Sequence, residues 1–267
     1  MTGIYMRFDD DFANSKYLAD GKYFPSRWQS KADAFRTAVG ERGQYDLAYG
    51  AGERQWIDLF LPEESPKGTV IFVHGGEWLA FGPRDFSHLA AGALARGWAC
   101  AMPAYTLAPA ARISDMTTEI ATALAAIGAM TEGPLVLTGH SAGGHLAARM
   151  VCGDLPLDDG LVARIARVVP ISPLSDLRPL CETSMAADLG LDLAEARAES
   201  PVLLVRRVGV PVTVWVGGDE RPRYLDQARR LGNAWSCPVK VEPGRHHFNV
   251  IEGLEQPDSP LMRALLG

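Results

Sequence analysis

The sequence predicts an α/β fold in which a mostly parallel central sheet carries helices on both faces, with a small helical cap inserted in the second half of the chain. From residue 69 onward, short apolar runs alternate with stretches whose apolar residues recur at helical spacing. The run at 69–73, TVIFV, is apolar almost throughout, which is typical of a strand buried on both faces. Ahead of it, two runs of alternating polarity indicate an antiparallel entry pair.

The predicted elements follow in order along the chain. Residues 30–39 carry apolar side chains at helical spacing and predict a first helix, and residues 45–49 and 55–61 predict the antiparallel pair. Further strands are expected at 69–73, 99–103, 135–139, 168–171, 211–216 and 239–241, and further helices at 85–95, 113–130, 142–152, 224–235 and 261–266. The turn-rich stretch at 173–199 is expected to form the small cap.

The length and the even composition predict one domain. A chain of 267 residues fits a single large α/β domain, and it shows no internal repeat, low-complexity tract or linker. We therefore expect residues 1–267 to form one unit. The first 40 residues are rich in aromatics without a clear period, and we expect them to wrap the core or to lie over a pocket as a lid.

Charge and cysteine content exclude several classes of function. A net charge of −6 without a basic run argues against a nucleic-acid surface and favours a small-molecule substrate. The first residues lack the basic and apolar regions of a secretory signal, and no apolar run has the length of a membrane span. The four cysteines lack ligand-like spacing. We expect a cytoplasmic protein without metal or cofactor and without membrane attachment, with a homodimer as one option for its oligomeric state.

The segment GHSAG, residues 139–143, follows a predicted buried strand and opens a helix rich in small residues. A strand–turn–helix of this kind holds a serine on a sharp, strained turn, and the flanking glycines avoid collisions between strand and helix. The pattern therefore predicts Ser141 as a nucleophile rather than as part of a structural turn.

A serine nucleophile needs a base to take its proton and an acid to orient that base. On this type of turn the chain order is serine, acid, histidine. Only His246 and His247 lie well downstream of Ser141, and both follow the last predicted strand. The acid is expected after the preceding strand, where Asp219 and Glu220 stand. Chemistry alone does not choose between these two carboxylates, and either one also suits the N-terminus of the following helix.

Catalysis also requires hydrogen-bond donors for the oxyanion of the tetrahedral intermediate. The amide of Ala142 is one candidate, and the loop HGGEW at 74–78 offers the amides of Gly75 or Gly76 as the other. Aromatic residues beside these loops are expected to line a substrate pocket, with ordinary core as the alternative: Trp78, Phe81, Tyr105 and Phe248. Three further histidines are interpreted as surface or packing residues: His88, His140 and His145.

At these residues the chain resembles the α/β-hydrolase superfamily and, more narrowly, its kynurenine formamidase (arylformamidase) and esterase branch. Four segments carry the resemblance: HGGEW at 74–78, GHSAGGH at 139–145, SDLRPL at 175–180 and HFNVIE at 247–252. It implies the α/β-hydrolase fold and a Ser-His-acid triad acting on a small-molecule amide or ester. An arylformamidase-like activity ranks ahead of a short-chain carboxylesterase or lipase. The resemblance favours His247 over His246 and Glu220 over Asp219.

One residue departs from the pattern of that branch. Position 77 is usually uncharged, and here it is Glu77. A carboxylate beside an oxyanion hole disfavours anionic substrates or binds a substrate ammonium, and N-formylkynurenine carries both an amine and a carboxylate. The substrate therefore stays open. The alternative of another class is a hydrolase-fold protein that keeps the pocket for a ligand without catalysis.

Overall fold

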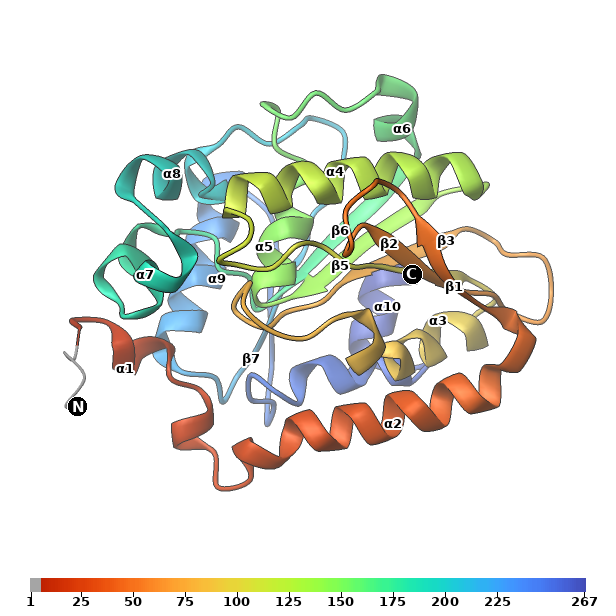
Figure 1. The fold of residues 1–267 in the computed structure, drawn as a ribbon, viewed down its shortest axis with the longest axis horizontal. Coiled ribbons are helices and arrows are strands. Elements are labelled where there is room, and N and C mark those ends of the chain that lie inside the picture. Colours follow the sequence, from red (N-terminus) through yellow and green to blue (C-terminus); the bar gives the residue numbers. More distant parts are fainter. Residues whose placement is uncertain (1–5) are drawn as a thin grey trace.

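The computed structural model describes residues 6–267, which contain one eight-stranded sheet in the order β1-β2-β4-β3-β5-β6-β7-β8 (Figure 1). β2 pairs antiparallel with β1 and β4, and the other neighbouring strands are parallel. The strands are β1 (Gly43–Ala48), β2 (Trp56–Phe60), β3 (Thr69–Val73), β4 (Ala99–Pro103), β5 (Leu135–His140), β6 (Ile165–Ile171), β7 (Val214–Gly217) and β8 (Val239–Glu242). The predicted fold class is confirmed.

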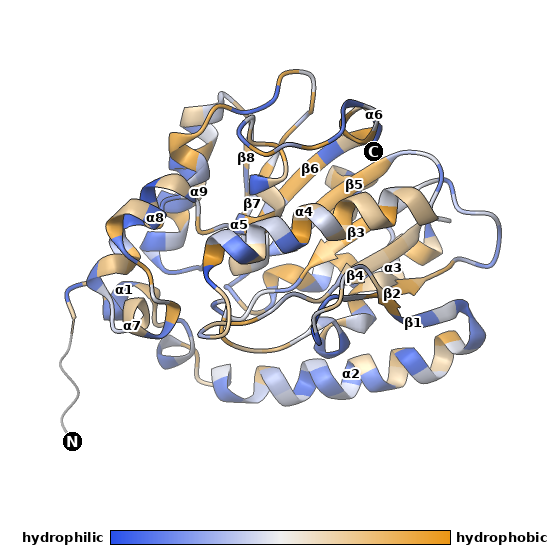
Figure 2. Cartoon of the chain, turned by 45° about the horizontal axis from the view of Figure 1, so that its top comes forward, coloured by the Kyte–Doolittle hydropathy of each residue, from blue (hydrophilic) through white to orange (hydrophobic). Residues whose placement is uncertain are grey.

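Helices cover both faces of this sheet (Figure 1). They are α1 (Asp9–Phe12), α2 (Phe24–Val39), α3 (Ala91–Ala95), α4 (Ile113–Met130), α5 (Ala142–Arg149), α6 (Asp159–Arg164), α7 (Met185–Leu189), α8 (Leu193–Ala198), α9 (Pro222–Trp235) and α10 (Pro260–Leu266). One hydrophobic cluster joins the sheet to α4, α5 and α9, and a second joins its other face to α2, α3 and α10. The central strands are mainly hydrophobic in Figure 2 because both of their faces are covered.

Most predicted elements are present, and two differ for identifiable reasons. α2 begins at Phe24, six residues before the predicted start, because the early aromatics Phe24 and Trp28 lie on its buried side. The helix expected at 85–95 is wrong as a single element. It is two short 3-10 turns followed by α3, with an interruption at Phe86 (φ −123°), whose side chain is 1% exposed in the second cluster.

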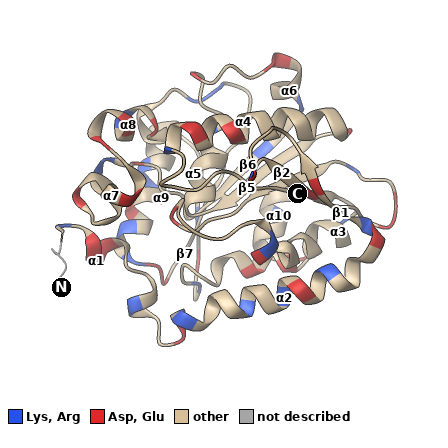
Figure 3. Ribbon diagram, viewed as in Figure 1, with Lys and Arg blue, Asp and Glu red and all other residues tan. Residues whose placement is uncertain are grey.

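The surface carries charges of both signs. On the outward side of α2, acidic and basic residues alternate instead of forming a patch of one sign (Figure 3). Within the described residues, no helix combines the length and the apolar character that a membrane crossing requires.

Two short segments flank the carboxyl edge of the sheet. The stretch at 173–199 folds into a 3-10 turn, α7 and α8. The N-terminal stretch, whose first five residues lie outside the described part, is held to α9 by ion pairs. Arg221 contacts Asp10 at 2.8 Å, and Arg223 pairs with Asp11. These pairs bring the N-terminal stretch close to the loops that follow the parallel strands.

Candidate active site

Ser141 occupies a strained turn between β5 and α5. Its backbone has φ 56° and ψ −115°, a region that residues with a side chain rarely adopt. The chain passes so tightly here that a Cβ atom on Gly143 would lie 2.0 Å from the carbonyl oxygen of Val73, and one on Gly139 would lie 2.3 Å from that of Gly143. Only glycine fits at these positions. The turn presents Ser141, which is 4% exposed, to a cavity beside the sheet.

Glu220 and His247 follow β7 and β8 and meet in the same cavity region. Nδ1 of His247 lies 2.7 Å from Oε2 of Glu220. The other carboxylate oxygen, Oε1, accepts hydrogen bonds from the hydroxyl of Ser172 and from the amide of Gly217. These contacts keep the carboxylate in one orientation, and they leave Nε2 of His247 as the nitrogen that can accept a proton.

The alternative residues are placed differently. Asp219 is exposed, and its side chain makes no recorded hydrogen bond or ion pair with a described residue. The ring of His246 packs edge-on against Phe24 at 5.3 Å, and its Nδ1 accepts a hydrogen bond from the amide of Phe248. The structure therefore brings His247 and Glu220 together and leaves Asp219 and His246 apart from that contact.

The loop after β3 packs directly onto the serine turn. A Cβ atom on Gly75 would lie 2.7 Å from the carbonyl oxygen of His140, so this position also requires glycine. Gly76 has φ 113° and Glu77 has φ 58°. The amides of Gly76, Glu77 and Ala142 donate no recorded hydrogen bond to any residue in 6–267, so they are available to an oxyanion. Sequence reasoning named Gly75, Gly76 and Ala142 but not the amide of Glu77.

The cavity at these residues has a volume of about 250 Å³. Its lining consists of Ala13, Asn14, Ser15, Pro25, Trp28, Gly76, Glu77, Ala80, Phe81, Phe86, His140, Ser141, His247 and Phe248. Of the four aromatic residues expected to line a pocket, Phe81 and Phe248 do so. Five lining residues come from the stretch before β1. The sequence predicts that this stretch wraps the core or covers a pocket, but it singles out none of the five as a pocket residue.

The expectation that Trp78 and Tyr105 line the pocket is corrected by the structure. Both side chains are fully buried. Trp78 packs edge-on against His145, and Tyr105 stacks on His74 at 4.4 Å and donates a hydrogen bond to its carbonyl oxygen. Both residues lie close in sequence to loops of the candidate site. The local backbone nevertheless directs their two rings into the core.

Tyr224, at the start of α9, was missed by sequence reasoning. Its ring centroid lies 4.2 Å from that of His247, and its hydroxyl interacts with the side chains of Asn14 and Ser141. Burial raises its pKa, with the carboxylate of Glu77 acting in the same direction, so the hydroxyl keeps its proton. The sequence position of Tyr224 could have indicated it. Tyr224 stands four residues after the predicted acid and on the buried side of an amphipathic helix.

The remaining histidines are buried and neutral. The ring of His140 lies 4.5 Å from that of His247, and burial holds its pKa well below the usual value. Nε2 of His145 lies 2.7 Å from the carbonyl oxygen of Glu199, which agrees with a packing role. The expectation that His88 lies on a helix surface is wrong, because its side chain packs under α2 and burial lowers its pKa to about 4.

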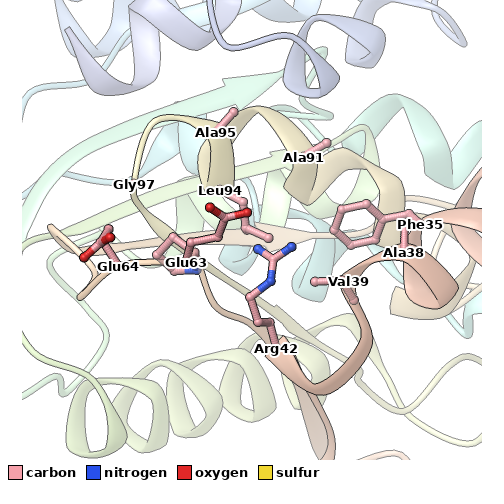
Figure 4. A pocket seen from close by; sticks show the side chains of 11 residues that line it. Phe35, Ala38, Val39, Arg42, Glu63, Glu64, Ala91, Leu94, Ala95 and Gly97 are labelled. Atoms are coloured by element: carbon pink, nitrogen blue, oxygen red, sulfur yellow. The ribbon is translucent and has the colours of Figure 1, made fainter.

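A larger cavity of about 470 Å³ lies between α2 and α3, beside the connection after β2 (Figure 4). Its walls are largely apolar, and the side chains of Arg42 and Glu63 extend into it. Its lining contains no serine, cysteine or histidine, so it lacks the side chains of a Ser-His or Cys-His pair. Within residues 6–267, no group of three or more His, Cys, Asp or Glu side chains is arranged to hold a metal ion.

Comparison with known proteins gives concordant similarities. Residues 70–202 match a protein family characterised by the alpha/beta hydrolase fold. The kynurenine formamidase of Danio rerio is 27% identical over 281 residues, which cover 94% of this chain and 96% of that protein. A proposed thioesterase from Silicibacter sp. tm1040 is 49% identical, with a TM-score of 0.96 over 98% of this chain and 100% of that chain. Esterase B of Lactobacillus rhamnosis has a TM-score of 0.65 at 20% identity and covers 92% of this chain and 93% of its own.

The chain belongs to the α/β-hydrolase family. Within that family it is similar in sequence to kynurenine formamidases and similar in fold to esterases, which confirms the resemblance carried by its loop motifs.

Proposed function

We propose that this chain is a serine hydrolase that acts on a small-molecule amide or ester, with Ser141 as nucleophile, His247 as base and Glu220 as the acid that orients the base. The observation that carries the proposal is the 2.7 Å contact between His247 and Glu220 beside a serine held on a strained turn. A turn of this conformation costs stability, and such strain is typical of positions where a reactive group has to be presented.

In the proposed mechanism, Oγ of Ser141 attacks the substrate carbonyl carbon while Nε2 of His247 takes the hydroxyl proton. The carboxylate of Glu220 stabilises the imidazolium that forms. The amide of Ala142 and one amide of the 75–77 loop donate hydrogen bonds to the oxyanion. His247 then gives the proton to the leaving nitrogen or oxygen, and a water molecule releases the acyl group from Ser141 by the same steps.

For the substrate we propose a short acyl group, with an arylformamide ranked ahead of a short-chain carboxylic ester. The small cavity supports a short acyl group, and the sequence similarity to a kynurenine formamidase favours the arylformamide. The 49% identity to a proposed thioesterase adds a thioester as a candidate that the same groups would cleave. We further propose that residues 1–267 act as one domain in which the N-terminal stretch forms a pocket wall and the 173–199 stretch a small cap.

The test is activity of matched variants on N-formylkynurenine, p-nitrophenyl acetate and an acetyl thioester. Ser141→Ala and His247→Ala are expected to lose turnover by a factor on the order of 10³ or more, because each removes a member of the unit that transfers the proton. His246→Ala serves as the matched control and is expected to retain turnover. Labelling by a fluorophosphonate separates catalysis from ligand binding alone. A folded protein that resists labelling and turns over none of the three substrates would overturn the proposal.

A further inference from the structure

Glu77 stands inside the catalytic cavity with an unpaired charge. Its side chain lines the same cavity as Ser141 and His247, and it makes no recorded ion pair or hydrogen bond with any residue in 6–267. Glu77 is exposed, so solvent reaches its carboxylate through the cavity. Desolvation by the surrounding protein groups nevertheless raises the pKa of this carboxylate, and the charge of His247 acts in the opposite direction. A ligand that brings a positive charge would relieve the cost of keeping this carboxylate ionised.

The rest of the cavity suits a cation. Of the described residues that line it, none is a lysine or an arginine, so the cavity offers no lysine or arginine cation to an anionic substrate group. Four aromatic side chains form part of its wall: Trp28, Phe81, Phe86 and Phe248. These rings pack against one another, with Trp28 at 5.2 to 5.9 Å from each of the other three. Aromatic faces together with a carboxylate are groups that bind ammonium ions.

We propose that Glu77 and the surrounding aromatic side chains recognise a substrate with a positively charged ammonium group close to its scissile carbonyl. The inference rests on the proposed hydrolase function and adds its substrate class, a small ester, thioester or amide with a cationic head. The ammonium contacts the carboxylate of Glu77 and the aromatic wall while the carbonyl faces Ser141. Glu77 and its neighbour Trp78 both have left-handed backbone angles, at φ 58° and 60°, and this backbone places the Glu77 side chain on the cavity wall.

The first experiment compares two esters of equal shape, acetylcholine and 3,3-dimethylbutyl acetate, which differ in the charge of the head group. The wild-type kcat/KM is expected to favour the cationic ester by about tenfold or more. In Glu77→Gln this ratio is expected to fall to near one, because the amide keeps the size of the side chain without the charge. Glu132→Gln is the matched control, since Glu132 is exposed just before β5, at the opposite edge of the sheet. This control is expected to keep the wild-type ratio.

The second experiment measures binding without catalysis. Calorimetry of Ser141→Ala with choline is expected to show binding that is lost in Ser141→Ala/Glu77→Gln and retained in Ser141→Ala/Glu132→Gln. Absence of choline binding together with equal turnover of the two esters would overturn the inference and leave the hydrolase proposal intact. Choline binding without turnover of either ester would support the cation site and contradict the proposed function instead. Should Glu77→Gln fail to fold, Glu77→Asp with its shorter carboxylate supplies the comparison and is expected to weaken choline binding.

Discussion

Nδ1 of His247 lies 2.7 Å from Oε2 of Glu220, although 27 residues separate the two along the chain. β7 and β8 bring them together, because the carboxyl ends of neighbouring parallel strands meet at one edge of the sheet. Since the second carboxylate oxygen is held by Ser172 and Gly217, the imidazole has a single orientation relative to the acid.

Replacing Glu220 by glutamine is expected to lower kcat by a factor on the order of 10³ to 10⁴ with little change in fold. The amide has the same shape, but its NH₂ group would favour the wrong tautomer of His247 and would not stabilise the imidazolium. Steady-state kinetics on a p-nitrophenyl ester measure the effect. Asp219→Asn is the control, and we expect its kcat to stay within about twofold of wild type because that carboxylate is exposed and has no recorded partner. Equal losses in both variants would contradict the assignment of the acid.

Tyr224→Phe removes the hydroxyl that interacts with Ser141 and Asn14 but keeps the ring against His247. We expect kcat/KM to fall about fivefold to tenfold, which corresponds to the loss of one hydrogen bond of about 1 kcal/mol. We assign the hydroxyl a positioning role, because its raised pKa disfavours proton transfer, and we therefore expect the pH profile to keep its shape. Tyr23→Phe, a change at a half-exposed tyrosine, is the control and is expected to have no effect. An altered pH profile in Tyr224→Phe would contradict this positioning role.

Arg149→Ala is expected to destabilise the protein by about 3 to 5 kcal/mol. The side chain of Arg149 is 2% exposed and contacts Glu199 at 3.0 Å and Asp154 at 2.9 Å, so its removal leaves a buried carboxylate without its cation. Urea unfolding monitored by tryptophan fluorescence measures the change.

Two further variants test that explanation for Arg149. Arg149→Met/Glu199→Gln is expected to be less destabilised than Arg149→Ala, because it removes both buried charges. Arg229→Ala, at an exposed position on α9, is expected to change stability by less than about 0.5 kcal/mol. A double variant as unstable as Arg149→Ala would show that lost packing, rather than the unpaired charge, causes the effect.

Acidification below pH 6.5 is expected to destabilise the fold. Burial lowers the pKa of His74 to about 3 and that of His88 and His145 to about 4. The unfolded chain, in which histidine has a pKa of about 6.5, therefore binds more protons than the native state between these values, and the free energy of unfolding falls as the pH falls. At about 1.4 kcal/mol per pKa unit, each group contributes about 3 to 5 kcal/mol over the whole window and about 2 kcal/mol of that between pH 6.5 and pH 5.

Urea unfolding at pH 7, 6 and 5 measures this slope. His88→Leu should reduce it, because both ring nitrogens of His88 lack a hydrogen-bond partner among the described residues and the site tolerates an apolar side chain. A free energy of unfolding that stays constant or rises from pH 7 to pH 5 would contradict the prediction.

Prediction from sequence succeeded where the pattern is local. The helix expected at 113–130 and the strand at 69–73 coincide with α4 and β3, because their apolar residues follow the period of one element and pack on the sheet. It failed at 85–95, where packing of Phe86 between α2 and the sheet interrupts the helix. The start of α2 was misplaced because Phe24 and Trp28 contact aromatic residues of distant loops as well as the core, which obscures a single period.

Within the candidate site, the sequence by itself determined the strained turn at Ser141 and the strand ends that carry Glu220 and His247. The strand–turn–helix pattern and the succession of strands along the chain can both be identified from neighbouring residues. Only the tertiary structure decided which side chains face the cavity. Phe81 and Phe248 enter it while Trp78 and Tyr105 turn into the core, and Asn14 and Trp28 arrive from a distant segment. The direction of a loop side chain depends on left-handed backbone angles and on long-range packing, and neither leaves a period in the sequence.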